Sequence, residues 1–222
     1  VKYVDDVSIA SVSSDLNNVN LHIARGFLEV LSNGNGMFIN TDKAKEMIVY
    51  FGRTYSDRDF KVLTCGGTHI ERVDVFKLLG VIISSDLTWK AHVSFIISKA
   101  CKRLFIIYQL VRSGIGVVDV IAVYCSLIRS VLEHCSPVWH CGLTQGQSSE
   151  IESVQKRVLK IVFPDLSYSN ALVRSGLEKL SIRRERLSIK TFNDIKSPSH
   201  VLNRLLVRKS VDERYVKTRD TY

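Results

Sequence analysis

The sequence lacks the features of secreted and membrane-spanning proteins. No run within its 222 residues approaches the roughly 18 consecutive apolar residues that a membrane-crossing helix requires. No basic segment followed by an apolar segment resembles a secretion signal. Internal repeats and low-complexity tracts are missing as well. We therefore expect no membrane partner and an intracellular location, either nuclear or cytoplasmic.

The sequence also lacks any C-x-x-C pair, and its five cysteines are an odd number. Without a secretion signal, this pattern favours reduced thiols in an intracellular protein. One local group has the residue types of a zinc site, namely His134, Cys135, His140 and Cys141. These residues come as two adjacent pairs, and adjacent side chains on a helix or strand point in different directions. We therefore do not expect them to form one tetrahedral site.

Acidic residues are scarce in the second part of the chain. Residues 1–90 carry ten Lys or Arg and eleven Asp or Glu, whereas residues 91–222 carry twenty-one and eleven, a net charge of +10. Such asymmetry favours a polyanionic partner, most simply nucleic acid. A solvated cationic surface without a partner is the alternative.

Two adjacent acids interrupt a β-prone segment at the start of the chain. Residues 1–9 predict a tight hairpin with Asp5 and Asp6 at its tip. Two carboxylates fixed on rigid strands suit a hard cation such as Mg²⁺. The alternative is a turn that contains Asp only because turns favour this residue.

The hydrophobic pattern predicts an α+β fold with short strands followed by helices. The first part should contain a helix over residues 14–30 and strands over residues 47–51, 60–65, 68–73 and 76–83. The second part should contain helices over residues 89–111 and 117–132, followed by a break at Pro137. Further helices should start at a capping box of Ser149 and Glu152, near Asn170, and at Ser181.

Several short segments follow one another in a recognisable order, beginning with Tyr3-Val4-Asp5-Asp6. The others are Asn40-x-x-Lys43, Phe76-Lys77-Leu78-Leu79-Gly80, Trp89-Lys90-x-His92-Val93, residues 99–104, residues 128–139 and Glu152-x-x-Gln155-Lys156-Arg157. This order resembles the C-terminal half of a reverse transcriptase from non-long-terminal-repeat retrotransposons, of the LINE-type and jockey-like lineages. The similarity covers most of residues 1–165. Val4 departs from the family, which more often has Ala there.

The resemblance implies three regions. Residues 1–85 would be part of a polymerase palm, with the Y-x-D-D hairpin and the strands that grip the primer. Residues 86–165 would form an all-helical thumb. Residues 166–222 would be a basic helical segment and tail, for which only composition is informative.

The resemblance also implies roles at the polymerase site. Asp5 and Asp6 would be palm acids that hold two Mg²⁺ ions, with Asp5 as the foremost direct ligand. Tyr3 and Val4 would lie beside the primer terminus. Lys43 would lie near the phosphates of the incoming dNTP, with Lys45 as the alternative. The primer grip would include Phe76, Lys77, Leu78 and Gly80.

The partners implied are an RNA template and a DNA primer. The thumb of the family binds their hybrid, and its cations contact phosphates without reading bases. The residues expected to do so here are Lys99, Lys102, Arg103, Lys156 and Arg157. The sequence leaves the oligomeric state open.

In the family, the first catalytic Asp and the fingers precede the Y-x-D-D box. Because this chain starts at Val1, we expect it to be inert alone, as a fragment of an RNA-directed DNA polymerase. Two alternatives remain at this stage: a non-catalytic nucleic-acid-binding module derived from a mobile element, and a helical interaction protein.

Overall fold

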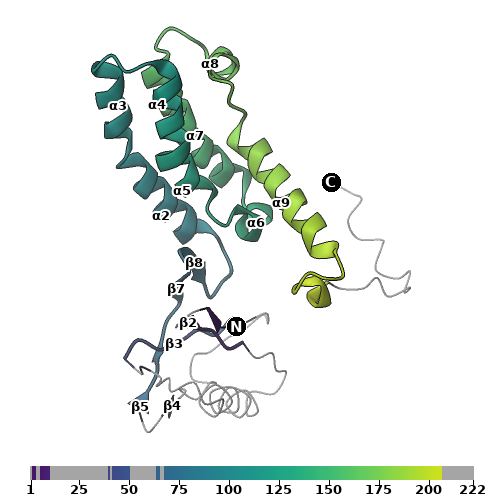
Figure 1. The fold of residues 1–222 in the computed structure, drawn as a ribbon. Coiled ribbons are helices and arrows are strands. Elements are labelled where there is room, and N and C mark those ends of the chain that lie inside the picture. Colours follow the sequence, from purple (N-terminus) through teal and green to yellow (C-terminus); the bar gives the residue numbers. More distant parts are fainter. Residues whose placement is uncertain are drawn as a thin grey trace. The chain divides into compact units, whose positions relative to one another are not determined.

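Short strands occupy the first part of the chain and helices the second in the computed structural model, so the α+β prediction is confirmed (Figure 1). The structure describes residues 2–3, 6–10, 40, 42–50, 64–65 and 68–206, and of residues 2, 3, 6, 7, 64 and 65 it describes the backbone only. The chain divides into two units, Val1–His92 and Val93–Tyr222.

Within the described residues of the first unit, the strands pair two by two. Three pairs are antiparallel: β1 (Lys2–Tyr3) with β2 (Asp6–Val7), β4 (Thr64–Cys65) with β5 (Thr68–His69), and β7 (Val75–Leu78) with β8 (Val81–Ser84). The fourth pair is parallel and joins β3 (Lys45–Glu46) to β6 (Glu71–Arg72).

Antiparallel pairing is present in both predicted hairpins, over two residues of each strand. Tyr3 lies opposite Asp6, so Asp6 belongs to β2 and not to the tip, and Val4 and Asp5 lie outside the described residues. The strand predicted over residues 68–73 is divided into β5 and β6, and β6 pairs with β3. In the second hairpin Cys65 lies opposite Thr68. Its turn, residues 66–67, and the helix predicted over residues 14–30 also lie outside the described residues.

The single strand predicted over residues 76–83 is wrong, because this segment is the β7–β8 hairpin. Its turn consists of Leu79 and Gly80, whose φ angles of 47° and 89° are both positive. Two left-handed residues in a two-residue turn match the twist of antiparallel strands. The strand predicted over residues 47–51 is also wrong over 47–50, which form no regular structure; β3 precedes them.

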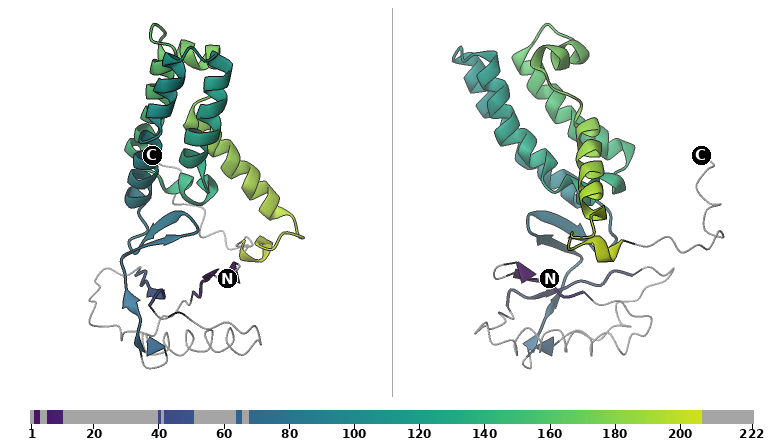
Figure 2. Two further views of the ribbon diagram at one scale, coloured as in Figure 1. Left: turned by 60° about the vertical axis from the view of Figure 1, so that its left-hand side comes forward. Right: turned by 45° about the vertical axis from the view of Figure 1, so that its right-hand side comes forward.

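The second unit is helical in its described part (Figures 1 and 2). Its first helix, α2, begins at Lys90, three residues before the boundary between the units at Val93. The described helices are α2 (Lys90–Cys101), α3 (Leu104–Arg112), α4 (Val117–Val123), the π-helix η2 (Tyr124–Arg129), α5 (Ser130–Glu133), α6 (Ser136–Trp139), the 3₁₀-helix η3 (His140–Gly142), α7 (Gln145–Val162), α8 (Tyr168–Ser175), α9 (Leu180–Lys196) and the 3₁₀-helix η4 (Asn203–Leu205). Helix α7 is central, since it packs against α3, α8 and α9.

The helix predicted over residues 89–111 is divided into α2 and α3. At the break, the Arg103 amide donates to the Ala100 carbonyl, three residues back instead of four. The apolar residues on which the prediction rested continue across the break. Five of them are buried, namely Val93, Ile96, Ala100, Leu104 and Ile107, whereas Trp89, Ile97, Leu110 and Val111 are half-buried.

The second predicted helix is continuous, but its middle turn is a π-helix. Helices α4, η2 and α5 follow one another without a gap, and the run ends before Pro137 as predicted. Pro137 then lies in the first turn of α6, where its missing N–H costs no hydrogen bond.

The capping box that opens α7 is not Ser149 with Glu152. Thr144 caps the helix: its Oγ1 accepts from the Gln147 amide at 3.2 Å, and Gln147 Oε1 accepts from the Thr144 amide at 2.8 Å. Thr144-x-x-Gln147 has the same pattern five residues earlier. Glu152 lies inside the helix and is buried.

No helix in the described part of the chain is both long enough and apolar enough to cross a membrane.

Candidate nucleic-acid interface and palm-like hairpin

The backbone of the acidic hairpin is known, but its carboxylates are not described. Tyr3 pairs with Asp6, so a two-residue link joins the strands at their common end. Val4 and Asp5 form that link and lie outside the described residues. The pairing places Asp6 opposite Tyr3 in a two-stranded antiparallel ribbon.

Lys43 and Lys45, the two candidates for a phosphate contact, lie in different surroundings. The Lys43 amide donates to the side-chain oxygen of Asn40 at 3.2 Å, which fixes a turn with Lys43 exposed. Lys45 forms an ion pair with Glu71 on the neighbouring strand. Among the described residues Lys43 has no ion-pair partner, so its charge is the more available for an anion.

The four residues expected to grip a primer share the β7–β8 hairpin. Phe76 and Lys77 are exposed on β7, Leu78 ends that strand, and Gly80 is in the turn. Exposed apolar side chains at Val75 and Leu79 flank them. A small hairpin that exposes this much apolar surface is typical of a segment that meets a partner.

A short, closely bonded link leads from β8 into α2. The Asp86 carboxylate accepts from the Thr88 amide at 3.0 Å, and the Ser84 hydroxyl lies 2.6 Å from it. These hydrogen bonds, the Ser84 contact first, hold the pKa of Asp86 below its ordinary value. Farther on, His92 Nδ1 accepts from the Ile82 amide at 3.2 Å, so this buried histidine fastens the helix start to the hairpin.

The basic residues of the α2–α3 region divide into two kinds. Lys99 and Lys102 are exposed. Arg103 instead donates to the Leu127 carbonyl in η2, where the π-helical geometry changes the usual hydrogen-bond pattern. Its guanidinium joins two helices, so its position is set by the fold.

The motif Glu152-x-x-Gln155-Lys156-Arg157 has two residues on the buried face of α7 and two on its exposed face. Glu152 and Gln155 are buried, whereas Lys156 and Arg157 are exposed. Residues three apart share a helix face, which explains why the first two point the same way.

The buried half of the motif anchors a chain of hydrogen bonds. The Tyr124 hydroxyl donates to Gln155 Oε1 at 2.6 Å, Gln155 Nε2 donates to the Tyr168 hydroxyl at 3.0 Å, and that hydroxyl donates to Glu152. Burial raises the pKa of both tyrosines well above the ordinary value, so both remain donors. These hydrogen bonds join η2, α7 and α8.

Glu152 also caps another helix. Its carboxylate accepts from the amides of Leu180 and Ser181 at 3.2 and 3.3 Å, which are the first residues of α9. A carboxylate at a helix N-terminus satisfies free amides and complements the helix dipole. Glu152 therefore holds α9 against α7.

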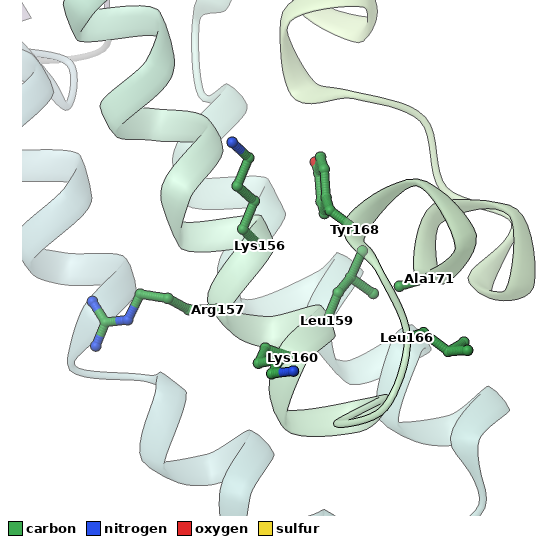
Figure 3. A pocket seen from close by; sticks show the side chains of 7 residues that line it. All are labelled: Lys156, Arg157, Leu159, Lys160, Leu166, Tyr168 and Ala171. Carbon is green, nitrogen blue, oxygen red and sulfur yellow. The ribbon is translucent and has the colours of Figure 1, made fainter.

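A shallow hollow of about 400 Å³ is lined by residues of α7, of α8 and of the loop that joins them (Figure 3). The Lys156 ammonium lies 5.4 Å from the centre of the Tyr168 ring. Lys160 donates to the Pro164 carbonyl. The remaining lining residues are Arg157, Leu159, Leu166 and Ala171.

A second hollow, of about 450 Å³, lies on the other side of the same basic residues, between α3 and α7. It is lined by Leu104, Phe105, Tyr108, Arg157, Lys160 and Ile161. Arg157 Nη1 donates to the Cys101 sulfur at 3.3 Å. Arg157 and Lys160 thus border both hollows. Of these residues the sequence predicted only Arg157 for nucleic acid.

The arginines of α9 serve the fold. Arg183 Nε lies 2.7 Å from Glu133 on α5, and Arg186 pairs with Glu178. Arg184 is fully buried, 5.9 Å from the Trp139 ring centre, and Nη2 donates to Ser148. Because Arg184 is buried, its guanidinium is exposed neither to solvent nor to a phosphate group.

His134, Cys135, His140 and Cys141 do not form a cluster. Cys135 and Cys141 are exposed, and across the described residues no three His, Cys, Asp or Glu side chains gather closely enough to hold a metal.

Comparisons of this chain with protein-family models, with curated proteins and with solved structures find no match.

Proposed function

We propose that this chain is part of an RNA-directed DNA polymerase of the non-long-terminal-repeat retrotransposon type, with Asp5 and Asp6 as palm acids. The observation that supports it most is the antiparallel pairing of Tyr3 with Asp6. This pairing gives the Y-x-D-D box the strand–turn–strand form that a pair of metal-binding carboxylates on a rigid support needs.

Asp5 and Asp6 would hold two Mg²⁺ ions. When bound, such ions would activate the primer 3′-hydroxyl and neutralise the leaving pyrophosphate. Lys43, exposed and without an ion-pair partner in the described part of the chain, would bind the dNTP phosphates. Lys45 is less suited because Glu71 already neutralises its charge.

Two further observations support the proposal. The primer-grip residues Phe76 and Lys77 are exposed on one hairpin, where they can touch a strand of nucleic acid. The following helices carry exposed cations at Lys99, Lys102 and Lys156. Cations of this kind bind phosphates irrespective of sequence.

The test is primer extension on an RNA template in Mg²⁺ by a longer protein, with this chain fused behind the upstream part of its reading frame. Asp5→Ala should lower extension to about one hundredth or less, since losing one preorganised charged group typically costs about 10²–10³-fold. Asp42→Ala, an exposed acid beside Lys43, is the matched control and should extend normally. Equal extension by both variants would contradict the proposal.

A second candidate is a nucleic-acid-binding module without catalysis. It is favoured by the cations of α7, because Lys156, Arg157 and Lys160 form no ion pair with any described residue. In this case the longer protein would bind an RNA–DNA hybrid and extend nothing.

A further inference from the structure

We infer that the hollow between α3 and α7 binds single-stranded nucleic acid, with a base stacked on Phe105 or Tyr108 and phosphates on Arg157 and Lys160. This site would operate without the acid pair, so it does not depend on the polymerase proposal.

The aromatic side of the hollow is exposed. Phe105 is 65% and Tyr108 51% exposed, although both lie on a helix whose Leu104 and Ile107 are buried. Residues three apart lie on the same side of a helix, and both rings line the hollow. Every base has a π-face that can stack on such a surface.

The basic side of the hollow carries uncompensated charge. Arg157 and Lys160 lie one turn apart on α7, and neither forms an ion pair with a described residue. On α9, by contrast, Arg183 and Arg186 each pair with an acid. Like charges one turn apart repel each other, and a bound phosphate would relieve that repulsion.

The two cations are nevertheless held in place. Arg157 donates to the Cys101 sulfur and Lys160 to the Pro164 carbonyl. Both acceptors are neutral, so they orient the cations without cancelling their charge. A guanidinium has five N–H donors and an ammonium three, which leaves donors for a phosphate.

The chemistry of the hollow fits a single strand better than a duplex. Its volume of about 450 Å³ lies within the roughly 300–1,000 Å³ of small-ligand sites. Stacking requires a base face that is free of neighbouring bases. The hollow beside α8 is less suitable, because Lys156 covers the Tyr168 ring and Glu152 binds its hydroxyl.

The test uses the full chain and fluorescent 12-nucleotide probes, with dT₁₂, rU₁₂ and a blunt duplex as separate arms. Anisotropy gives Kd over 50–200 mM salt, in EDTA and without dNTP, so the result is independent of any metal site. Tyr108→Ala and Phe105→Ala should weaken single-strand binding about 5- to 100-fold. Tyr108→Trp should keep it. Arg157→Gln and Lys160→Gln should each reduce the slope of log K against log salt by about 0.7.

Matched controls come from the same unit. Phe192→Ala on α9 removes an exposed aromatic ring, and Arg174→Gln on α8 removes an exposed cation. Neither residue lines the hollow between α3 and α7 or the hollow between α7 and α8. Both should bind like the wild type. The inference is overturned if the variants of the hollow bind like these controls. It is also overturned if the duplex binds more tightly than the single strands, or if no salt-dependent binding occurs. Unchanged melting temperatures confirm that each variant is folded.

Discussion

Leu79 is a side-chain-bearing residue in a backbone conformation that favours glycine. Its φ is 47°, and it occupies the first position of the two-residue turn between β7 and β8, before Gly80. The left-handed region costs a residue with a Cβ roughly 1–2 kcal/mol, whereas asparagine tolerates it, and Asn-Gly is the favoured sequence of such turns.

Leu79→Asn should therefore raise the free energy of unfolding by about 0.5–1 kcal/mol, measured by urea denaturation. Leu79→Ala is the control, because it removes the exposed side chain and keeps the backbone cost. A gain from alanine as large as that from asparagine would show that the exposed side chain, and not the turn, is responsible.

The Glu152 carboxylate accepts hydrogen bonds from Tyr168, Leu180 and Ser181. Glu152→Gln should lower the free energy of unfolding by about 1–3 kcal/mol, because an NH₂ group would replace one of the carboxylate oxygens that accept from Tyr168, Leu180 and Ser181. Thermal unfolding measures the loss. Glu150→Gln, an exposed acid on the same helix, should stay within about 0.5 kcal/mol of the wild type. A similar loss in both variants would refute the cap.

At the scale of elements, the link from β8 to α2 depends on one carboxylate. Hydrogen bonds from Ser84 and Thr88 lower the pKa of Asp86 below its ordinary value of 3.8. A carboxyl whose pKa is lower in the folded state stabilises the fold above its unfolded pKa. That stabilisation is lost as the pH falls through the folded pKa.

Asp86→Asn should therefore be less stable than the wild type at pH 7, and the difference in melting temperature should shrink as the pH falls below about 4. Melting curves at pH 7, 5 and 3 measure this. Asp42→Asn, another exposed acid of the first unit, shows the background effect of losing one charge. A difference that stays constant down to pH 3 would contradict the assigned role.

Helical periodicity predicted where the helices lie but not where they begin. Val93, Ile96 and Ile107 form a stripe that burial confirms, because a period of three to four residues follows directly from helix geometry. The break before α3 depends on the Arg103 contact with η2, which joins distant segments. The hairpin turn at Leu79 escaped prediction because an apolar residue in a left-handed turn has no local signal.

The candidate interface was predictable in its charge and not in its shape. Composition indicated a basic second half, and the resemblance singled out Lys156 and Arg157. The sequence did not show that the neighbouring Gln155 is buried, since only packing decides which face of α7 is covered. The sequence analysis did not single out Phe105 and Tyr108, which α3 exposes beside the buried Leu104 and Ile107.

At the scale of the whole molecule, the polymerase proposal predicts that the 222-residue chain alone does not extend a primer. In the family that this chain resembles, a further catalytic Asp precedes the Y-x-D-D box, so Asp5 and Asp6 would supply only part of the ligand set. An incomplete set binds Mg²⁺ weakly and aligns no nucleotide. Incorporation of labelled dNTP on an RNA template measures this, with the longer fusion protein as the positive control. Extension by the chain alone would contradict the prediction.

The Glu152 cap has a consequence for amide hydrogen exchange. The first amides of a helix normally exchange fast, because they have no carbonyl partner within the helix. In α9 the amides of Leu180 and Ser181 are bonded to a buried carboxylate of α7. Their deuterium uptake therefore requires α7 and α9 to separate, which makes the start of α9 a reporter of the opening of the whole helical unit.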